Sequence, residues 1–244
     1  MSVHWRSYLD AHAAAEAAAH HILALLDNAL AGQERATFAI SGGSTPKLLF
    51  QELVKSGYRW EPVHLFWVDE RAVPPTDPHS NYKLAEEFLI TPAHIPRRNV
   101  HRIQGEITPE RAAEHYADDI RDFFALDEGA MPHFDIVQQG MGPEAHTASL
   151  FPGEPLIEDR EGIAAAVHVP VEPQWRITLL PGVLLAARHT VFLVSGEDKA
   201  AAVHAVFHDD YDPKRLPAQV ISHHGRSVSW FLDDAASRLL REAE

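Results

Sequence analysis

Four short polar segments contain the side chains that could carry chemistry, and each of them follows a run of apolar residues. The segment richest in glycine and hydroxyl groups consists of Ser41, Gly42, Gly43, Ser44 and Thr45, followed by Pro46. Its glycines allow the backbone to approach a ligand, and its hydroxyls and the first N–H groups of a following helix can donate hydrogen bonds. This composition suits a phosphate group, although an ordinary glycine turn with a serine cap would have a similar sequence.

Basic residues in two further segments could complete an anion site. Arg71 comes after Asp69 and Glu70 at the end of an apolar run. Its guanidinium could bind a phosphate through two parallel hydrogen bonds, or it could form an ion pair that only holds the loop. Arg176 and Lys199 could serve the same anion, although a surface position is the commoner explanation for a lysine such as Lys199.

The most informative segment runs from Gly140 to Pro152, with the sequence GMGPEAHTASLFP. His146 follows an apolar run and a glycine-rich bend, and histidine is the usual side chain for proton transfer near neutral pH. A lone histidine is more often structural, but this position after a strand favours a catalytic role. Gly142, Glu144 and Thr147 share the segment and are candidate site residues with it.

Composition excludes several kinds of function. The 244 residues contain no cysteine, so disulfide frameworks, thiolate metal sites and thiol nucleophiles are excluded. The net charge of −14 argues against nucleic-acid binding. The spacing of the 17 histidines shows no metal-binding pattern such as HExxH, and the chain has no GxSxG nucleophile motif. We therefore predict no metal site and expect most histidines to lie on the surface.

Short apolar runs that alternate with helical patterns predict an α/β fold with a mostly parallel sheet. No linker or repeat interrupts the chain, so residues 1–244 are expected to form a single domain. In such sheets ligands bind beyond the carboxyl ends of the strands, where the four polar segments would meet. The pattern also predicts a helix from Tyr8 to Leu30, a loop at Asp69–Arg71 and a late strand at Gln219–Ile221.

The sequence shows neither a targeting signal nor an apolar run long enough to span a membrane. We expect a cytoplasmic protein with no membrane and no nucleic-acid partner. The oligomeric state is left open, with a monomer favoured.

Taken together, the polar segments resemble those of the 6-phosphogluconolactonases of the pentose phosphate pathway. The matching segments are SGGSTP at 41–46, WVDER at 67–71, SNY at 80–82, residues 140–152, RIT at 176–178, GEDK at 196–199 and LPAQ at 216–219. The resemblance implies a Rossmann-like α/β/α sandwich of the NagB type, shared with glucosamine-6-phosphate deaminase. It also implies hydrolysis of 6-phospho-D-glucono-1,5-lactone to 6-phosphogluconate without a cofactor.

The resemblance also implies roles for individual residues. His146 would be the general base for attack of water, and an N–H group in the bend 140–142 could stabilise the oxyanion. The substrate phosphate would be bound by Ser41, Gly42, Gly43, Ser44, Thr45, Arg71, Arg176 and Lys199. Further site residues would be Asp69, Gly142, Glu144 and Thr147.

The chain departs from the family pattern close to its histidine. Glu144 and Ala145 stand where an Asp-Gly pair is usual, and a positive φ at Ala145 would cost on the order of 1 kcal/mol. Gln138 and Gln139 occupy a strand end that is usually apolar, so both need hydrogen-bond partners if they are buried. Leu185 stands where asparagine is common.

These departures keep two alternatives open. One is a sugar-phosphate-binding protein that retains the cradle but no longer turns substrate over. The other is an amino-sugar-phosphate deaminase or isomerase, in which Asp69 would take a proton from C2 of the sugar.

Overall fold

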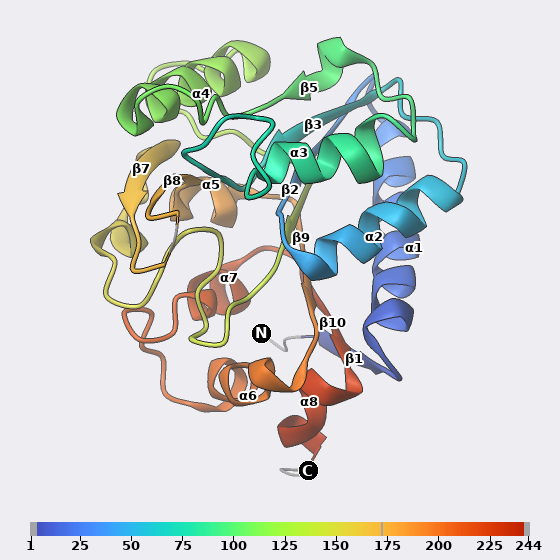
Figure 1. The fold of residues 1–244 in the computed structure, drawn as a ribbon, viewed down its shortest axis with the longest axis vertical. Helices are drawn as coiled ribbons and strands as arrows, with labels where there is room; N and C mark the ends of the chain where they lie inside the picture. The colour runs from blue at the N-terminus through green and yellow to red at the C-terminus, as the bar shows by residue number, and fades with distance from the viewer. Residues whose placement is uncertain (1–3, 172, 242–244) are drawn as a thin grey trace.

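A seven-stranded parallel sheet runs through the computed structural model, which describes residues 4–171 and 173–241 (Figure 1). Its strand order is β1-β10-β9-β6-β2-β3-β5, and every neighbouring pair is parallel. The strands are β1 (His4–Tyr8), β2 (Ala36–Ile40), β3 (Val63–Trp67), β5 (Val100–His101), β6 (Ile136–Gln139), β9 (His189–Val194) and β10 (Val228–Asp233). The α/β fold with a mostly parallel sheet is thus confirmed.

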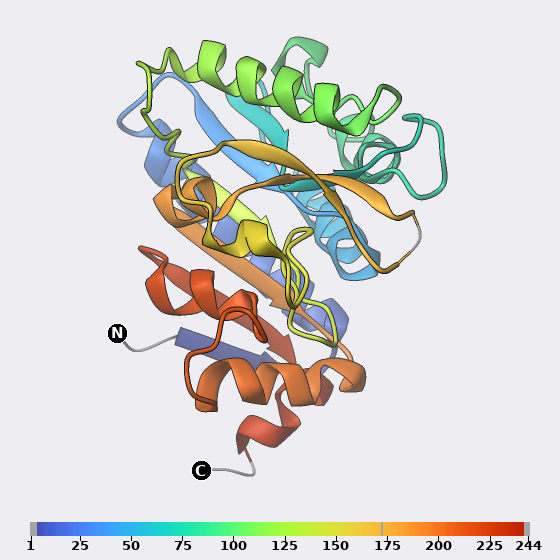
Figure 2. The same cartoon turned by 90° about the vertical axis from the view of Figure 1, so that its left-hand side faces the viewer.

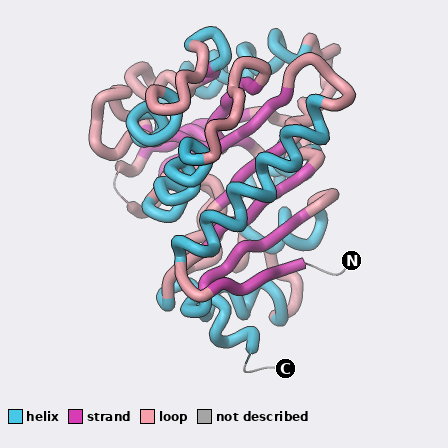
Figure 3. The backbone as a smooth tube through the Cα atoms, turned by 90° about the vertical axis from the view of Figure 1, so that its right-hand side faces the viewer, coloured by secondary structure: helices cyan, strands magenta, loops and turns pink. Residues whose placement is uncertain are grey.

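Helices cover this sheet because its strands are apolar on both faces. Every residue of β2 is buried, as expected for a strand with packed elements on either side. The helices are α1 (Ala11–Leu30), α2 (Ser44–Lys55), α3 (Asn81–Ala85), α4 (Pro109–Phe124), α5 (Pro181–Ala186), α6 (Ala200–His208), α7 (Ala218–His224) and α8 (Asp234–Arg241). Short turns are η1 (Glu86–Ile90), η2 (Arg97–Asn99), η3 (Pro155–Glu158) and η4 (Glu197–Lys199). α1 and α2 lie together on one face of the sheet (Figure 3).

Local sequence signals set the ends of several helices. Asp10 caps α1, because its Oδ1 accepts hydrogen bonds from the N–H groups of His12 and Ala13 at 3.0 and 2.9 Å. Ser80 caps α3 in the same way, with its Oγ accepting from Lys83 N. Along the described residues, no helix is long and apolar enough to cross a membrane.

A second, three-stranded sheet lies over the other face of the main sheet (Figure 2). It consists of β4 (Asp69–Arg71), β8 (Trp175–Leu179) and β7 (Ala164–His168), and both of its pairings are antiparallel. The prediction of a loop at Asp69–Arg71 was therefore wrong. Three consecutive charged residues do not favour a strand by their own propensities. They form one here because they pair with the edge of β8.

Two other predictions need correction. Gln219–Ile221 lies within helix α7, because the short apolar run Val220–Ile221 does not distinguish a strand from a buried helical turn. The first helix begins at Ala11, and Tyr8 belongs to β1, which pairs with β10. Neither of these two strands was predicted.

Candidate active site

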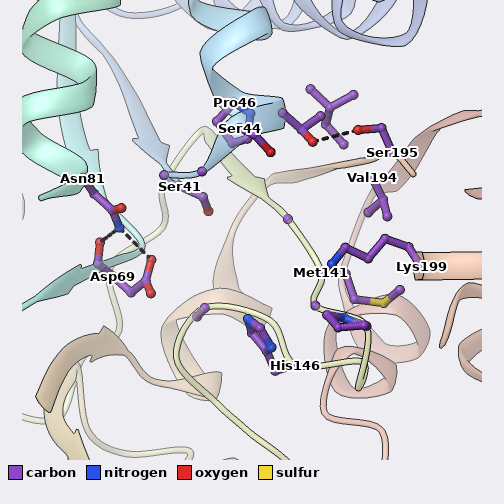
Figure 4. A pocket seen from close by; sticks show the side chains of 18 of the residues that line it. Ser41, Ser44, Pro46, Asp69, Asn81, Met141, His146, Val194, Ser195 and Lys199 are labelled. Atoms are coloured by element: carbon purple, nitrogen blue, oxygen red, sulfur yellow. Dashed lines mark hydrogen bonds between the residues drawn. The ribbon is translucent and has the colours of Figure 1, made fainter. Parts of the chain in front are cut away.

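The carboxyl ends of β2, β3, β6 and β9 surround one pocket, at the place expected for a parallel sheet (Figure 4). Two further walls come from the small sheet and from η4. The pocket brings together most of the residues predicted from the sequence: Ser41, Gly42, Gly43, Ser44, Thr45, Asp69, Arg71, Gly142, His146, Arg176 and Lys199. Glu144 contacts His146 at the rim, whereas Thr147 is fully buried and does not line the pocket.

The glycine-rich segment forms a turn that leads from β2 into the N-terminus of α2. Ser41 fixes its start, because its N–H donates to Gln138 Oε1 at 3.0 Å and its Oγ donates to the Gln138 carbonyl at 2.9 Å. Gly43 has φ 114°, which favours glycine, and a Cβ on Gly42 would lie 1.8 Å from Asn81 Oδ1. The backbone of this turn therefore requires its two glycines.

The first turn of α2 is joined to the opposite wall of the pocket. Thr45 Oγ1 and Ser195 Oγ, which follows β9, lie 2.8 Å apart in a hydrogen bond (Figure 4). Lys199 lines the same wall and forms an ion pair with Asp198, with Nζ and Oδ2 2.9 Å apart. Hydroxyl groups, helix N–H groups and an ammonium group thus face the pocket, which is the donor set that an anion needs.

Two arginines stand side by side in the small sheet. Arg71 of β4 pairs in register with Arg176 of β8. Arg176 is only 7% exposed, and burial together with the charge of Arg71 lowers its pKa, although a guanidinium stays protonated in proteins. The Nε of Arg71 is buried and has no hydrogen-bond partner. An anion placed between the two guanidinium groups would relieve their repulsion and use this free donor.

The carboxylate of Glu70, next to Arg71 in the chain, holds the surrounding loop. Glu70 is buried and accepts from Ser80 Oγ and from the N–H groups of Arg71, Asn81 and Tyr82 at 2.7–3.0 Å. Burial raises the pKa of Glu70, and these hydrogen bonds oppose the rise. Within the described part of the chain Arg71 forms no ion pair, so Glu70 holds the loop without engaging its guanidinium.

Asp69 is held by hydrogen bonds at the floor of the pocket. Its Oδ2 accepts from Ser149 Oγ at 2.6 Å, and its Oδ1 accepts from Asn81 Nδ2 at 3.3 Å. Asp69, the first residue of β4, therefore joins the small sheet to the histidine segment. The sequence marks Asn81 only as part of the SNY match, yet Asn81 lines the pocket, lies against Gly42 and donates a hydrogen bond to the Asp69 carbonyl.

His146 presents its imidazole to the pocket and contacts a carboxylate behind it. Its Nδ1 lies 3.1 Å from Glu144 Oε1, and this contact is the main cause of the lowered pKa of Glu144. A Cβ on Gly142 would lie 2.1 Å from the same Nδ1, so only glycine fits under the ring. The N–H of Gly142 donates to the His146 carbonyl at 3.0 Å. This N–H is therefore already used, and the expected oxyanion donor must be sought elsewhere than at Gly142.

The positive φ anticipated for Ala145 is present. Ala145 has φ 63° and is fully buried, and Ala148 has φ 52°. The left-handed region is unfavourable for alanine by about 1 kcal/mol per residue. Tertiary contacts hold the segment there, including a hydrogen bond of 3.0 Å from Ala218 N to the Ala145 carbonyl.

The two glutamines at the end of β6 are both fully buried and only partly partnered. Gln138 Oε1 accepts from Ser41 N, and Gln139 Oε1 accepts from Thr147 Oγ1. The Nε2 group of each has no partner among the described residues. Gln138 thereby supports the glycine turn and Gln139 supports the histidine segment. No group of three His, Asp or Glu residues within the described ranges could hold a metal ion.

Comparison with known proteins identifies relatives along almost the whole chain. The family described as glucosamine-6-phosphate isomerases/6-phosphogluconolactonase matches residues 9–230. The 6-phosphogluconolactonase of Homo sapiens is 40% identical over 214 residues, which cover 84% of this chain and 82% of the relative. The 6-phosphogluconolactonase of a Synechocystis strain is 34% identical over 217 residues, covering 88% and 89%.

Solved structures agree with these relatives. The 6-phosphogluconolactonase of Trypanosoma brucei superposes with a TM-score of 0.88 at 25% identity, covering 98% of this chain and 99% of that one. A monomeric glucosamine-6-phosphate deaminase of the NagB superfamily has a TM-score of 0.82 at 16% identity, covering 97% and 99%. The NagB-type fold expected from the sequence is thus confirmed.

Proposed function

The chain belongs to the family of glucosamine-6-phosphate isomerases and 6-phosphogluconolactonases, and on this basis we propose that it hydrolyses 6-phospho-D-glucono-1,5-lactone to 6-phosphogluconate in the oxidative pentose phosphate pathway. One observation carries the proposal. A histidine with a carboxylate partner, a glycine-rich helix N-terminus and three basic side chains line the same pocket. A phosphorylated ester ring needs both halves of this arrangement, one for its phosphate and one for its carbonyl.

In the proposed reaction His146 acts as general base. Glu144 Oε1 lies 3.1 Å from Nδ1, which has no aligned hydrogen bond in this structure. A small rotation of the carboxylate would let it accept from Nδ1–H, which would fix the tautomer and leave Nε2 free to accept a proton from water. The water oxygen attacks the lactone carbonyl and forms a tetrahedral intermediate. That intermediate collapses as the ring C–O bond breaks, and the imidazolium returns the proton to the departing ring oxygen. The products are the carboxylic acid, which ionises, and the free hydroxyl.

The phosphate is proposed to bind to the basic and glycine-rich parts of the pocket lining. Arg71, Arg176 and Lys199 supply charge, and the turn 41–45 supplies hydroxyl and N–H donors. Short-range donors of this kind can bind an anion to a protein with net charge −14, because salt screens the field of distant carboxylates within about 10 Å.

The geometry favours the lactonase over both alternatives. A deaminase or isomerase would use Asp69 to take a proton, but this carboxylate already accepts from Ser149 and Asn81. A binding protein without turnover was suggested by Glu144, Ala145 and Leu185. Ala145 nevertheless adopts the left-handed conformation that the loop requires, and Glu144 lies 3.1 Å from His146. We include in the proposal that the chain acts as a cytoplasmic monomer, with no cofactor, nucleic acid or membrane partner.

The proposal is tested by following lactone loss directly. The lactone is generated in situ and its disappearance is followed by NMR, with and without protein, at a pH where spontaneous hydrolysis is slow. Acceleration over the blank is expected, and His208→Ala, which changes an exposed histidine on α6, should retain it. Absence of acceleration would contradict the proposal, and saturable binding without turnover would instead support the binding protein.

A further inference from the structure

One aromatic contact at His146 links the imidazole to a part of the molecule that lies outside the main hydrophobic core. The ring of Phe151 stacks on the imidazole, with centroids 4.1 Å apart and an angle of 16° between the planes. Phe151 is 6% exposed, so its ring is fixed by its surroundings. The stack covers one face of the imidazole, and Glu144 meets its Nδ1 edge. Together these two contacts restrict both the tilt and the rotation of the ring.

The other neighbours of Phe151 belong to the small antiparallel sheet. Phe151, Val167 and Val169 form a buried cluster separate from the main core, with Leu156 packed against it. Val167 lies in β7, and Val169 follows directly after that strand. The position of the Phe151 ring is therefore set by β7 and not by the parallel sheet.

The same sheet carries the two arginines of the pocket. Arg71 pairs in register with Arg176, and Arg176 pairs in register with Val167. Residues paired in register on neighbouring strands lie on the same face of a sheet. A single row across three strands thus contains both guanidinium groups and the side chain that supports Phe151.

We propose that Phe151 is a positioning residue that holds the imidazole plane of His146 at a fixed place relative to Arg71 and Arg176. The inference rests on the proposed function, in which His146 is the base and the arginines bind the phosphate. The row Arg71–Arg176–Val167 fixes the distance between the two guanidinium groups and the Phe151 cluster. The stack of Phe151 on His146 then fixes the imidazole relative to that row. A loosely held base would bind substrate normally and reach the attacking water less often.

The decisive variant is Phe151→Leu, which keeps an apolar side chain in the cluster and removes the aromatic face. We expect kcat to fall about 10-fold or more with KM changed less than about 3-fold, because misplacement of a catalytic group affects the chemical step. Phe151→Tyr keeps the ring and should restore most of kcat. Phe134→Leu is the matched control: it removes a fully buried ring from the main core, outside the Phe151 cluster, and it should keep kcat within about 3-fold of the unmodified protein.

A spectroscopic readout separates this inference from the proposed function. The ring protons of His146, identified by their loss in His146→Ala, should shift downfield in Phe151→Leu, because the shielding by the aromatic face is gone. Phe134→Leu should leave them in place. Unchanged His146 resonances, or an unchanged kcat, in Phe151→Leu would overturn the positioning role. Failure of the unmodified protein to hydrolyse the lactone would overturn the proposed function while leaving the shift measurement valid.

Discussion

The two halves of the pocket differ in which residue type adopts a positive φ. In the glycine turn 41–46, the residue with positive φ is Gly43, which adopts that conformation without steric cost. In the histidine segment 140–152, positive φ falls on Ala145 and Ala148. The half proposed to bind the phosphate is therefore specified by its own sequence. The histidine half is held in a strained shape by contacts with β4, β6, β7 and α7. Strain of this kind is common at functional sites.

This difference predicts that substitutions in one half can change kcat or KM without affecting the other half. The largest change in activity is expected at His146. His146→Ala removes the proposed base, so kcat should fall about 10²- to 10⁴-fold while KM stays within a few-fold. Steady-state NMR kinetics with His208→Ala as control would measure this. A variant that keeps its kcat would show that another group takes the proton.

The next largest effect is expected in the phosphate half. Arg71→Met keeps approximately the length of the side chain and removes its charge. KM should rise about 10- to 100-fold, which corresponds to the free energy of one or two lost charge-assisted hydrogen bonds. kcat should change little. Thermal unfolding of the same variant checks that the loop is intact, and an unchanged KM in a folded variant would make Arg71 a structural residue.

A smaller effect is expected at Glu144, with a pH dependence of defined sign. Glu144→Gln keeps the shape and removes the charge beside His146, and kcat should fall about 10-fold because the tautomer is less well fixed. The pKa of Glu144 is lowered in the folded state. Its contribution to stability is therefore present above the unfolded pKa of 4.5 and is lost as the pH falls through the lower, folded value.

Chemical denaturation of Glu144→Gln between pH 6 and pH 3 tests that sign. The unmodified protein should lose more stability across about pH 4.5 and below than the variant does, since the glutamine does not titrate. Parallel pH profiles for the two proteins would mean that the Glu144–His146 contact has no energetic effect.

The smallest effect is expected on stability, when the strained alanine Ala145 is replaced by glycine. Ala145→Gly relieves the left-handed strain, at the loss of one buried methyl group, so stability should stay the same or rise by up to about 1 kcal/mol. The matched control is Ala117→Gly, at a buried alanine in the middle of α4, which should cost about 1 kcal/mol or more. Equal destabilisation by the two changes would show that Ala145 is not strained.

The features that could be predicted from the sequence are those with local signals, and the features that were missed depend on distant contacts. The glycine turn and Arg71 were found because a strand, two glycines and a helix start are local signals. The strand at β4 and the helix at Gln219–Ile221 were missed because each depends on a distant partner: β8 for the first, and Ala145, whose carbonyl accepts from Ala218, for the second. The stack of Phe151 on His146 has no sequence signal, because two rings meet only after the segment 146–151 has folded back on itself.

We propose that one half of the pocket binds the phosphate and the other performs the hydrolysis. The most direct measurement compares kcat and KM of His146→Ala and Arg71→Met in one NMR assay of lactone loss. We predict that the first variant loses kcat and keeps KM, and that the second keeps kcat and loses affinity. Loss of kcat in both variants, or of affinity in both, would contradict the division.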